Sequence, residues 1–299
     1  MKILVPVDGS SYSANAVDFV AHRGSLMGTE PGVELLNVQL PVPTRAARVV
    51  GKSVVDGYYA DEAKKALKPA QQRLAKAGVS CVARYVVGNP AEQIAKAAED
   101  DDVDLIVMGS HGRSALRGLI FGSVTHTVLA HTLKPLLILR SKQAPSTPAL
   151  RVGIAVDGSK YGRAAARYVI KHRALFGEQA EFVLIHVTAD YAGAVMPDMA
   201  GMALPALSEA EVLELQRKEL AGALKSVRPA FDKAGVAVTE AGLVGNPGDE
   251  IAAYARKRKL DLVVMGSHGY GAFKAAVMGS TATRVAAAGD TPVLLIRQA

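Results

Sequence analysis

Two glycine-rich turns carry the strongest chemical signal in this sequence. The first reads Gly109-Ser-His-Gly112 and is followed, after nine residues, by Gly122-Ser123. Glycines let backbone N–H groups approach an anion closely, and a Gly-Ser step into a helix offers unpaired N–H groups, a hydroxyl and the positive end of the helix dipole. Each such contact with a negative charge contributes about 0.3–1 kcal/mol. The spacing therefore predicts a phosphate-binding loop, unless the glycines only shape a tight turn.

The same constellation occurs a second time. Gly266-Ser-His-Gly269 follows another apolar run, and Gly279-Ser280 comes after a further nine residues. Two copies with matching spacing favour phosphate binding over a purely structural turn, and Arg113 and Arg117 add positive charge beside the first copy. No G-x-x-x-x-G-K-[ST] segment and no G-x-G-x-x-G segment occurs, so neither a P-loop nor the usual dinucleotide fingerprint is supported.

One aspartate follows the first apolar run of each half. These are Asp8 and Asp157, each within Val-Asp-Gly-Ser. In a doubly wound sheet the ligand crevice lies outside the carboxyl ends of the strands, where the strand order reverses, and a carboxylate there suits ribose hydroxyls. If the first and fourth strands are neighbours, Asp8 faces Gly109 across that crevice. Asp-Gly-Ser is also prone to form turns and helix caps, so a ribose contact and a local turn are equally supported.

The histidines and serines give no catalytic set. His111 and His268 lie inside the glycine turns, where a phosphate contact and a loop-shaping hydrogen bond are both open. His126 and His131 are five residues apart, so they do not share a helix face and make a poor metal pair. No G-x-S-x-G elbow occurs, and no paired acid and base is placed to activate water. We therefore expect no catalytic residue and no metal site.

The whole chain repeats itself, and four pairs of segments match. Three pairs keep an offset of 157 residues and the first keeps 149, so the second copy carries eight extra residues. The matching segments are Lys2–Ser10 with Arg151–Ser159, Val87–Ala95 with Val244–Ala252, Val103–Gly112 with Leu260–Gly269, and Gly122–Ala130 with Gly279–Ala287. Duplication at this spacing predicts two similar domains, at 1–141 and 150–299, joined by a short, fairly stiff linker with two prolines.

Strands and helices are expected to alternate within each copy. In the first copy, apolar runs predict strands at 3–7, 33–38, 79–87, 105–108 and 136–139, and periodic segments predict helices at 14–20, 61–77, from residue 90, and at 123–131. Such alternation forms right-handed βαβ units around a parallel sheet, so the fold class is α/β with two tandem doubly wound domains. Residues 41–55 and 188–207 are expected to be long irregular loops. The second contains Met196, Met199 and Met202, which suit adaptable contacts, unless the loops are lids.

Composition bounds the classes of protein that fit. The chain has 299 residues and a net charge of +7 at pH 7. Residues 1–141 hold 16 Lys/Arg against 13 Asp/Glu and the rest hold 19 against 15, so no basic block exists and a nucleic-acid partner is not expected. Cys81 is the only cysteine, which excludes an intrachain disulfide and fits a reducing compartment. With no signal-peptide core and no long apolar run, we expect a cytoplasmic protein without membrane contact.

These motifs resemble the universal stress protein family in its tandem-domain, ATP-binding form. The likeness covers nearly the whole chain, once per half, and its specific part is G-x-x-G, nine residues, then G-[ST]. The opening Pro-Val-Asp-Gly-Ser and the Gly-Asn-Pro turns at 88–90 and 245–247 also look like the family. The resemblance implies a Rossmann-like, adenine nucleotide alpha hydrolase-like fold with a five-stranded parallel sheet, order 3-2-1-4-5, in each half. It implies ATP as the ligand, or ADP or AMP, with or without Mg²⁺.

The same resemblance assigns the binding residues. Asp8 would contact ribose and Val38 would lie by the adenine, while the two glycine turns would line adenosine and hold the phosphates. The full set is Pro6, Asp8, Val38, Met108, Gly109, Gly112, Arg113, Gly122, Ser123 and Val124 in the first half, and Asp157, Val187, Met265, Gly266, Gly269, Gly279, Ser280 and Thr281 in the second. Tyr270 replaces the cation aligned with Arg113, and Ala155 replaces Pro6. We therefore expect the second site to be weaker or altered in phosphate preference.

The function implied is that of a nucleotide-dependent sensor or regulator of the stress response, with at most slow ATP hydrolysis. A catalytic adenylating or hydrolase enzyme is one alternative. A nucleotide-free assembly module with vestigial sites is the other, and the intact glycines in both halves speak against it. Single-domain members of the family pair through edge strands, so the two halves of this chain are expected to pair internally, which leaves a homodimer open.

Overall fold

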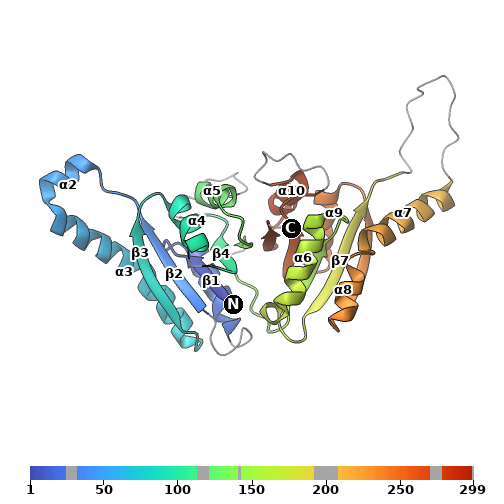
Figure 1. The fold of residues 1–299 in the computed structure, drawn as a ribbon, viewed down its shortest axis with the longest axis horizontal. Coiled ribbons are helices and arrows are strands. Elements are labelled where there is room, and N and C mark those ends of the chain that lie inside the picture. Colours follow the sequence, from blue (N-terminus) through green and yellow to red (C-terminus); the bar gives the residue numbers. More distant parts are fainter. Residues whose placement is uncertain are drawn as a thin grey trace, which may run out of the picture.

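The fold is a duplicated α/β unit built on one twisted sheet (Figure 1). The computed structural model describes residues 1–24, 32–100, 102–112, 121–140, 143–191, 208–269 and 278–297. The first half contributes β1 (Lys2–Pro6), β2 (Gly32–Gln39), β3 (Cys81–Val87), β4 (Leu105–Gly109) and β5 (Leu136–Leu139). The second contributes β6 (Arg151–Ala155), β7 (Glu181–Thr188), β8 (Val238–Val244), β9 (Leu262–Gly266) and β10 (Val293–Ile296).

The sheet order is β3-β2-β1-β4-β5-β10-β9-β6-β7-β8. Within each half all neighbouring strands are parallel, and each half has the order 3-2-1-4-5 that the family resemblance implied. A parallel pair needs a crossover between its strands, and helices supply it here.

Helices cover both faces of the sheet. Those of the first half are α1 (Ser11–Ala21), α2 (Thr44–Val50), α3 (Lys52–Lys76), α4 (Pro90–Asp100) and α5 (Ser123–His131). Those of the second are α6 (Lys160–Lys171), the short 3₁₀ helix η2 (Arg173–Phe176), α7 (Glu209–Leu224), α8 (Arg228–Lys233), α9 (Pro247–Lys257) and α10 (Ser280–Ala288). Serines begin the equivalent helices α1 and α6: the hydroxyl of Ser10 accepts from the Ser13 N–H at 3.2 Å, and that of Ser159 from the Gly162 N–H at 3.1 Å.

Two apolar layers sandwich the sheet because successive side chains of a strand point to opposite faces. Ile3 and Val5 of β1 belong to the layer that includes residues of α1, α3 and α6, whereas Leu4 belongs to the layer that includes residues of α4, α5, α9 and α10. Each layer contains residues of both halves, so the two domains share both cores. The sheet and its helices thus form one body that fixes where the strand ends lie.

The halves meet at their last strands. β5 and β10 pair antiparallel, with Leu137 opposite Leu294. Arg140 donates from Nε to the carbonyl of Gly289 at 2.8 Å, and the Tyr168 hydroxyl donates to the carbonyl of Asp104 at 3.3 Å. The two half-sheets are therefore continuous through a backbone ladder and two cross-domain side-chain bonds.

The expectation of an irregular loop at residues 41–55 is wrong. This segment forms α2 and the first turn of α3, so α3 begins at Lys52 instead of near residue 61. The sequence between Thr44 and Val50 has no glycine or proline to break a helix, and Gly51, with φ +86°, provides the bend between the two helices. Figure 1 shows α2 and the beginning of α3 projecting beyond β3. In the other segment expected to be irregular, 188–207, residues 192–207 and the three methionines lie outside the described residues.

No helix in the part of the chain that the structure describes combines the length and apolar character that crossing a bilayer requires.

The third strand begins at Cys81 and not at Val79, because the Val79 N–H still bonds the carbonyl of Leu74 at 2.9 Å as part of the turn that ends α3. Burial raises the pKa of the Cys81 thiol, which keeps it protonated.

Acid is expected to weaken the junction of the domains through His172, whose ring packs against Tyr168 at 4.4 Å. Burial is the main cause that lowers the pKa of His172 below its ordinary 6.5. The positive charges of Lys171 and of the N-terminus lower this pKa further, whereas the negative charge of Asp104 raises it. The unfolded chain therefore takes up this proton at higher pH than the folded chain. The stability that depends on neutral His172 is present above about pH 6.5 and is lost as the pH falls through the folded pKa.

Urea unfolding at about pH 7.5 and about pH 5.5 measures this effect. The His172→Gln variant should lose less stability between these two pH values than the native chain does. Equal losses in the two proteins would show that His172 is not responsible.

Candidate functional site

The carboxyl ends of two central strands form the candidate site in each half. β1 and β4 are neighbours in the first sheet, with Ile3 opposite Leu105. The chain leaves β1 toward β2 on one side and leaves β4 toward β5 on the other. The two exits diverge, and a doubly wound sheet has its ligand crevice at such a point. β6 and β9 repeat the arrangement in the second half.

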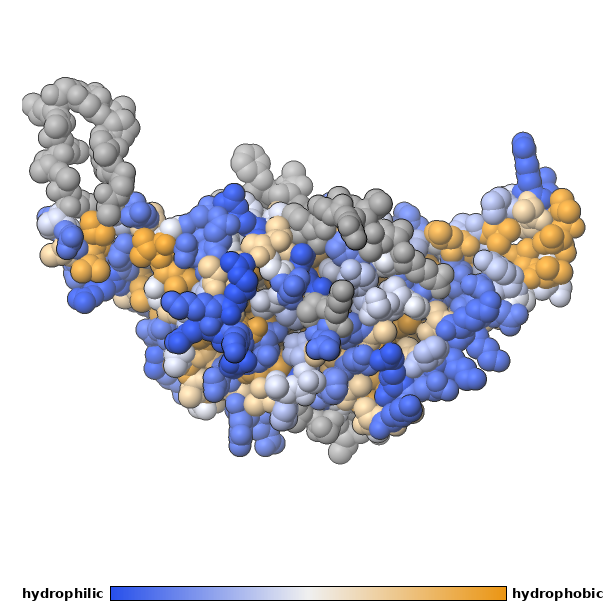
Figure 2. Space-filling view, turned by 180° about the vertical axis from the view of Figure 1, so that it is seen from behind, coloured by the Kyte–Doolittle hydropathy of each residue, from blue (hydrophilic) through white to orange (hydrophobic). Residues whose placement is uncertain are grey.

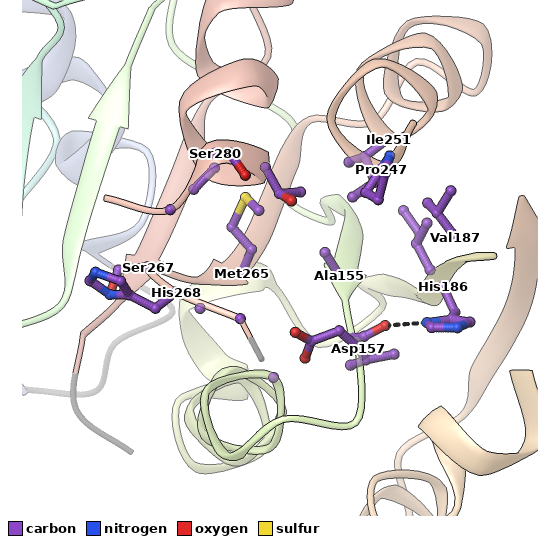
Figure 3. Close-up of a pocket in the computed structure, with 18 of the residues that line it drawn as sticks. Ala155, Asp157, His186, Val187, Pro247, Ile251, Met265, Ser267, His268 and Ser280 are labelled. Atoms are coloured by element: carbon purple, nitrogen blue, oxygen red, sulfur yellow. Dashed lines mark hydrogen bonds between the residues drawn. The ribbon is translucent and has the colours of Figure 1, made fainter. Parts of the chain in front are cut away.

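A pocket of about 580 Å³ occupies this position in the second half (Figure 3). That volume lies in the range of small-molecule sites. All eight residues expected for the second site line it: Asp157, Val187, Met265, Gly266, Gly269, Gly279, Ser280 and Thr281. In Figure 3, Asp157 and Ser280 lie at opposite ends of the pocket, with Ala155 and Met265 between them. The structure thus brings the predicted residues of the second half together around one cavity.

Asp157 takes part in a local turn and also faces the glycine loop. Its Oδ1 accepts from the Ser159 N–H at 3.0 Å, which is the turn that the sequence allowed. Its Oδ2 lies on the side of Gly269, where a Cβ would be only 2.7 Å away. The geometry is therefore compatible with both the local turn and the ribose contact that the sequence allowed. One oxygen of the carboxylate holds the turn, and the other lies against the loop that borders the pocket.

Asp8 repeats this geometry in the first half. Its Oδ1 accepts from the Ser10 N–H at 2.9 Å, and a Cβ on Gly112 would lie 2.8 Å from its Oδ2. Phosphate binding is therefore not the only reason for glycine in these turns. Gly112 and Gly269 must also leave room for the carboxylate of Asp8 or Asp157.

The helices that follow the glycine turns begin without a side-chain cap. Gly122 and Gly279 occupy the N-cap positions of α5 and α10, both extended and neither with a capping hydrogen bond from a side chain. In contrast, α1, α6, α7 and α9 each have a capping serine or asparagine. The N–H groups of the first turn of α5 and α10 are therefore left for another acceptor.

Backbone bonds fix these uncapped helix starts against the turns. The N–H of Gly122 donates to the carbonyl of Ser110 at 2.8 Å, and the N–H of Gly279 donates to that of Ser267 at 2.7 Å. Ser123 and Ser280 follow directly, with exposed side chains. The turn after the fourth strand and the helix start thus form one rigid border of the crevice in each half.

Gly109 and Gly266 have a packing role. A Cβ on Gly109 would lie 2.6 Å from Cβ of Tyr12 and 2.8 Å from its backbone, and a Cβ on Gly266 would lie 2.6 Å from Cβ of Tyr161. These glycines let α1 and α6 approach the fourth strand of their domain. They shape the wall of the crevice through helix packing.

The histidines of the glycine turns form the loop-shaping bond. His111 Nδ1 lies 3.0 Å from the Ser110 hydroxyl, and His268 Nδ1 lies 2.9 Å from the Ser267 hydroxyl. Each ring also packs against a tyrosine, Tyr12 at 5.5 Å in the first half. The two copies agree closely, so this local structure is part of the fold. His268 still borders the pocket.

The sequence analysis did not predict His186, which lines the pocket from β7. Its Nδ1 donates to the carbonyl of Val156 at 2.8 Å, which leaves Nε2 as the acceptor of a neutral ring. Asn37 makes the same bond in the first half, from Nδ2 to the carbonyl of Val7 at 2.7 Å. Both side chains tie the end of the second strand to that of the first. The repeat alignment that pairs Val38 with Val187 could have found this pair.

Other residues of the pocket wall come from elements whose positions only the fold reveals. Ile185 precedes His186 on β7, Pro247 and Ile251 belong to α9, and Met278 and Ala282 flank the start of α10. Pro247 lies in the Gly-Asn-Pro turn, which the sequence marked as a family feature without a role in the site. These side chains make much of the cavity wall apolar.

Three of the residues expected for the first site, Val38, Met108 and Val124, belong to or pack against one apolar cluster. Pro6 and Met108 are buried at the ends of β1 and β4, and Val38 and Val124 are half-buried. Arg113, Arg117 and Tyr270 lie outside the described residues, so the expected difference in charge between the two sites stays a prediction. Ala155, the other departure, lines the second pocket.

Among the described residues, no three His, Cys, Asp or Glu side chains gather in a way that could hold a metal ion. The ionisable side chains of the second pocket are Asp157, His186 and His268. This donor set suits hydroxyl and amine groups of an organic ligand better than direct coordination of a cation.

Comparison with known proteins agrees with this architecture. A model described as the universal stress protein family matches residues 1–140 and, separately, 149–297. The chain belongs to the universal stress protein family. Its two family domains correspond to the two halves of the sheet.

Individual relatives match either about half of the chain or nearly all of it. Universal stress protein YxiE of Bacillus subtilis is 33% identical over 147 residues, covering 46% of this chain and 98% of its own. Universal stress protein Rv1996 of Mycobacterium tuberculosis is 24% identical and aligns with 99% of this chain and 95% of its own. A crystal structure of a universal stress protein from Archaeoglobus fulgidus covers 100% of this chain and 98% of its own with a TM-score of 0.70 at 22% identity, which supports the fold.

Proposed function

We propose that each domain of this universal stress protein binds one adenine nucleotide, with ATP as the first candidate and ADP and AMP as the others. One observation carries the proposal. A carboxylate at the end of β6 and an uncapped helix start at α10 lie at opposite ends of a single pocket with apolar walls. A nucleotide has parts that suit these three features: phosphates for the helix start, a ribose diol for the carboxylate and a flat base for the apolar wall.

Each part of the ligand has a counterpart in the pocket. The start of α10, with Ser280 and Thr281, offers N–H groups and hydroxyls to phosphate oxygens. Asp157 offers a carboxylate oxygen to the ribose hydroxyls. The apolar side chains of Ile185, Val187 and Ile251 offer surface to the base. The first domain repeats the carboxylate and the helix start at Asp8 and α5.

The proposed role is binding that reports nucleotide levels during stress, with at most slow hydrolysis. Catalysis of hydrolysis requires a group that takes a proton from water within hydrogen-bond reach. The oxygen of Asp157 that is bonded to Ser159 and the Nδ1 atoms of His186 and His268 already have partners. A kcat of about 1 s⁻¹ or more would place the protein among ordinary enzymes and would favour the hydrolase alternative.

Isothermal titration with ATP, ADP and AMP tests the proposal, and we expect about two nucleotides per chain. The variants Asp8→Asn and Asp157→Asn keep an oxygen that can accept the turn hydrogen bond but remove the charge. Each should weaken one site by roughly ten- to a hundredfold, the worth of a hydrogen bond to a charged group. Asp61→Ala, an exposed change on α3, is the control and should leave both sites intact.

Adenine released on denaturation is a second measurement, and its absorbance is easily seen because the chain has no tryptophan. Absence of heat with all three nucleotides, together with no released adenine, would favour a nucleotide-free assembly module instead.

A further inference from the structure

An exposed apolar arm projects from the first domain. The arm consists of residues 40–58, which contain α2 and the first turns of α3. Leu40, Val49 and Val54 expose 68%, 86% and 60% of their surfaces, and Val50 and Tyr58 are also exposed. Figure 2 shows apolar residues gathered at this end of the molecule. Single exposed apolar residues are ordinary, but a cluster of this kind marks a contact surface.

The first-domain arm is also basic. Residues 40–58 contain Arg45, Arg48 and Lys52 against one acidic residue, Asp56, so the net charge of the arm is +2. All three cations are exposed. The partner of this surface should therefore combine apolar side chains with negative charge.

The second domain presents that chemistry at the equivalent place. The first turns of α7, residues 208–215, form an acidic arm. They contain Glu209, Glu211 and Glu214 with no Lys or Arg, a net charge of −3. Lys218, in the next turn of α7, pairs with Glu214 at 3.4 Å. Leu213 and Leu215 are exposed beside them. Like the basic arm, the acidic arm belongs to the segment between the second and third strands of its domain.

The two arms of one chain cannot meet. α3 packs on β2 and β3, at one edge of the sheet, whereas α7 packs on β7 and β8, at the other edge. Figure 1 shows α2 and α7 at opposite ends of the molecule. A second copy turned by a twofold axis can bring each basic arm to the acidic arm of its partner, and such a dimer makes the contact twice.

We propose that two copies of this chain associate through their arms, the basic apolar arm (40–58) of each binding the acidic apolar arm (208–215) of the other. Opposite charge selects the partner arm and the exposed valines and leucines supply buried apolar area. An anionic membrane suits the basic arm alone. Because both arms rise toward the same side of the molecule in Figure 1, a flat anionic surface that meets the basic arm would also meet the acidic arm.

Charge reversal tests the pairing by sedimentation velocity at concentrations up to about 100 µM, which covers weak complexes. We expect the native chain to form dimers. Arg45→Glu with Arg48→Glu gives two acidic arms, and Glu209→Arg with Glu214→Arg gives two basic arms. Each double variant should raise the dimer dissociation constant about tenfold or more. The control, Lys96→Glu with Lys257→Glu, makes the charge change of the Arg45 and Arg48 variant at exposed positions of α4 and α9 and should dimerise normally.

Mixing the two double variants is the decisive step, because the acidic arms of one variant then meet the basic arms of the other. A restored dimer that contains one copy of each supports the pairing, and circular dichroism confirms that each variant is folded. A native chain that stays monomeric would overturn the proposal, and so would dimers that persist in both double variants. Binding of the monomeric native chain to phosphatidylserine vesicles would overturn it in favour of a membrane surface.

Discussion

ATP should lose nearly all of its stabilising effect on the variant that combines Gly112→Ala with Gly269→Ala. At about a hundred times Kd, one occupied site adds about 2.7 kcal/mol, a rise in Tm of roughly 5–10 °C for a domain of this size. The new methyl groups would lie 2.8 Å from Oδ2 of Asp8 and 2.7 Å from Oδ2 of Asp157. These contacts are too short, so the carboxylates must turn away from the ribose position.

Asp157 has little room to retreat. Its Oδ1 is held by the Ser159 N–H, and Gly162 lies so close that a Cβ there would be 3.0 Å from the same oxygen. Turning the carboxylate therefore breaks the turn that places it. The double variant should keep its fold, because neither methyl meets fixed backbone, yet it should no longer grip the sugar in either domain.

Thermal unfolding with and without ATP measures this loss. Gly57→Ala with Gly222→Ala is the matched control, one change in each domain, because a Cβ at either position meets nothing within 4 Å. Both lie in helices, where alanine raises stability by roughly 0.5–1 kcal/mol, and the ATP-dependent rise should be unchanged. A full rise in the Gly112 and Gly269 variant would contradict the assigned sites. The single variants report the share of each domain, and the sequence predicts the larger loss for Gly112→Ala.

Signals that lie within one short segment predicted the fold well. The continuous apolar run at residues 3–7 marked a strand buried on both faces, and Ile3, Leu4 and Val5 are indeed divided between two cores. The internal repeat predicted two domains, because its motifs can be recognised from short segments that occur once in each half. Asp157 and Gly269 could be predicted for the same reason, since each lies within three residues of the end of a strand.

Contacts set by tertiary packing were not predictable in this way. His186 reads as an ordinary strand residue until β7 lies beside β6 and brings its ring to the carbonyl of Val156. Pro247 and Ile251 enter the pocket wall only because α9 covers the same face as α10. Helix α2 lies in the segment expected to be irregular. Pro41 and Pro43 both precede the helix and leave its hydrogen bonds intact.

The contacts of Arg23 with the linker were also not predictable, because the sequence identified the linker only as a short stretch with prolines. Its side chain is fully buried. The guanidinium donates to three linker carbonyls, those of Pro145 at 3.2 Å, Thr147 at 2.6 Å and Pro148 at 3.2 Å. The second domain holds the other end of the linker, since the Leu150 N–H donates to the carbonyl of Phe176 at 2.9 Å. The linker is therefore fastened to both domains.

Arg23→Ala should lower the free energy of unfolding by about 2–4 kcal/mol, because three linker carbonyls lose a charged donor at once and a hydrogen bond to a charged group contributes about 1.5–3 kcal/mol. Relief of the buried charge offsets part of this cost: burial lowers the pKa of Arg23, with Asp261 opposing. Arg23→Lys should fall between, since an ammonium keeps the charge but lacks the fork that spans several carbonyls.

Urea unfolding measures the loss, and limited proteolysis at residues 143–150 reports whether the linker has come free. Arg217→Ala, an exposed arginine on α7, is the control and should change stability by no more than about 0.5 kcal/mol. If Arg23→Ala unfolds like the control and its linker resists protease, the bonds to Pro145, Thr147 and Pro148 do not hold the domains together. If stability falls and cleavage appears there, one buried side chain of the first domain fixes the path of the chain into the second.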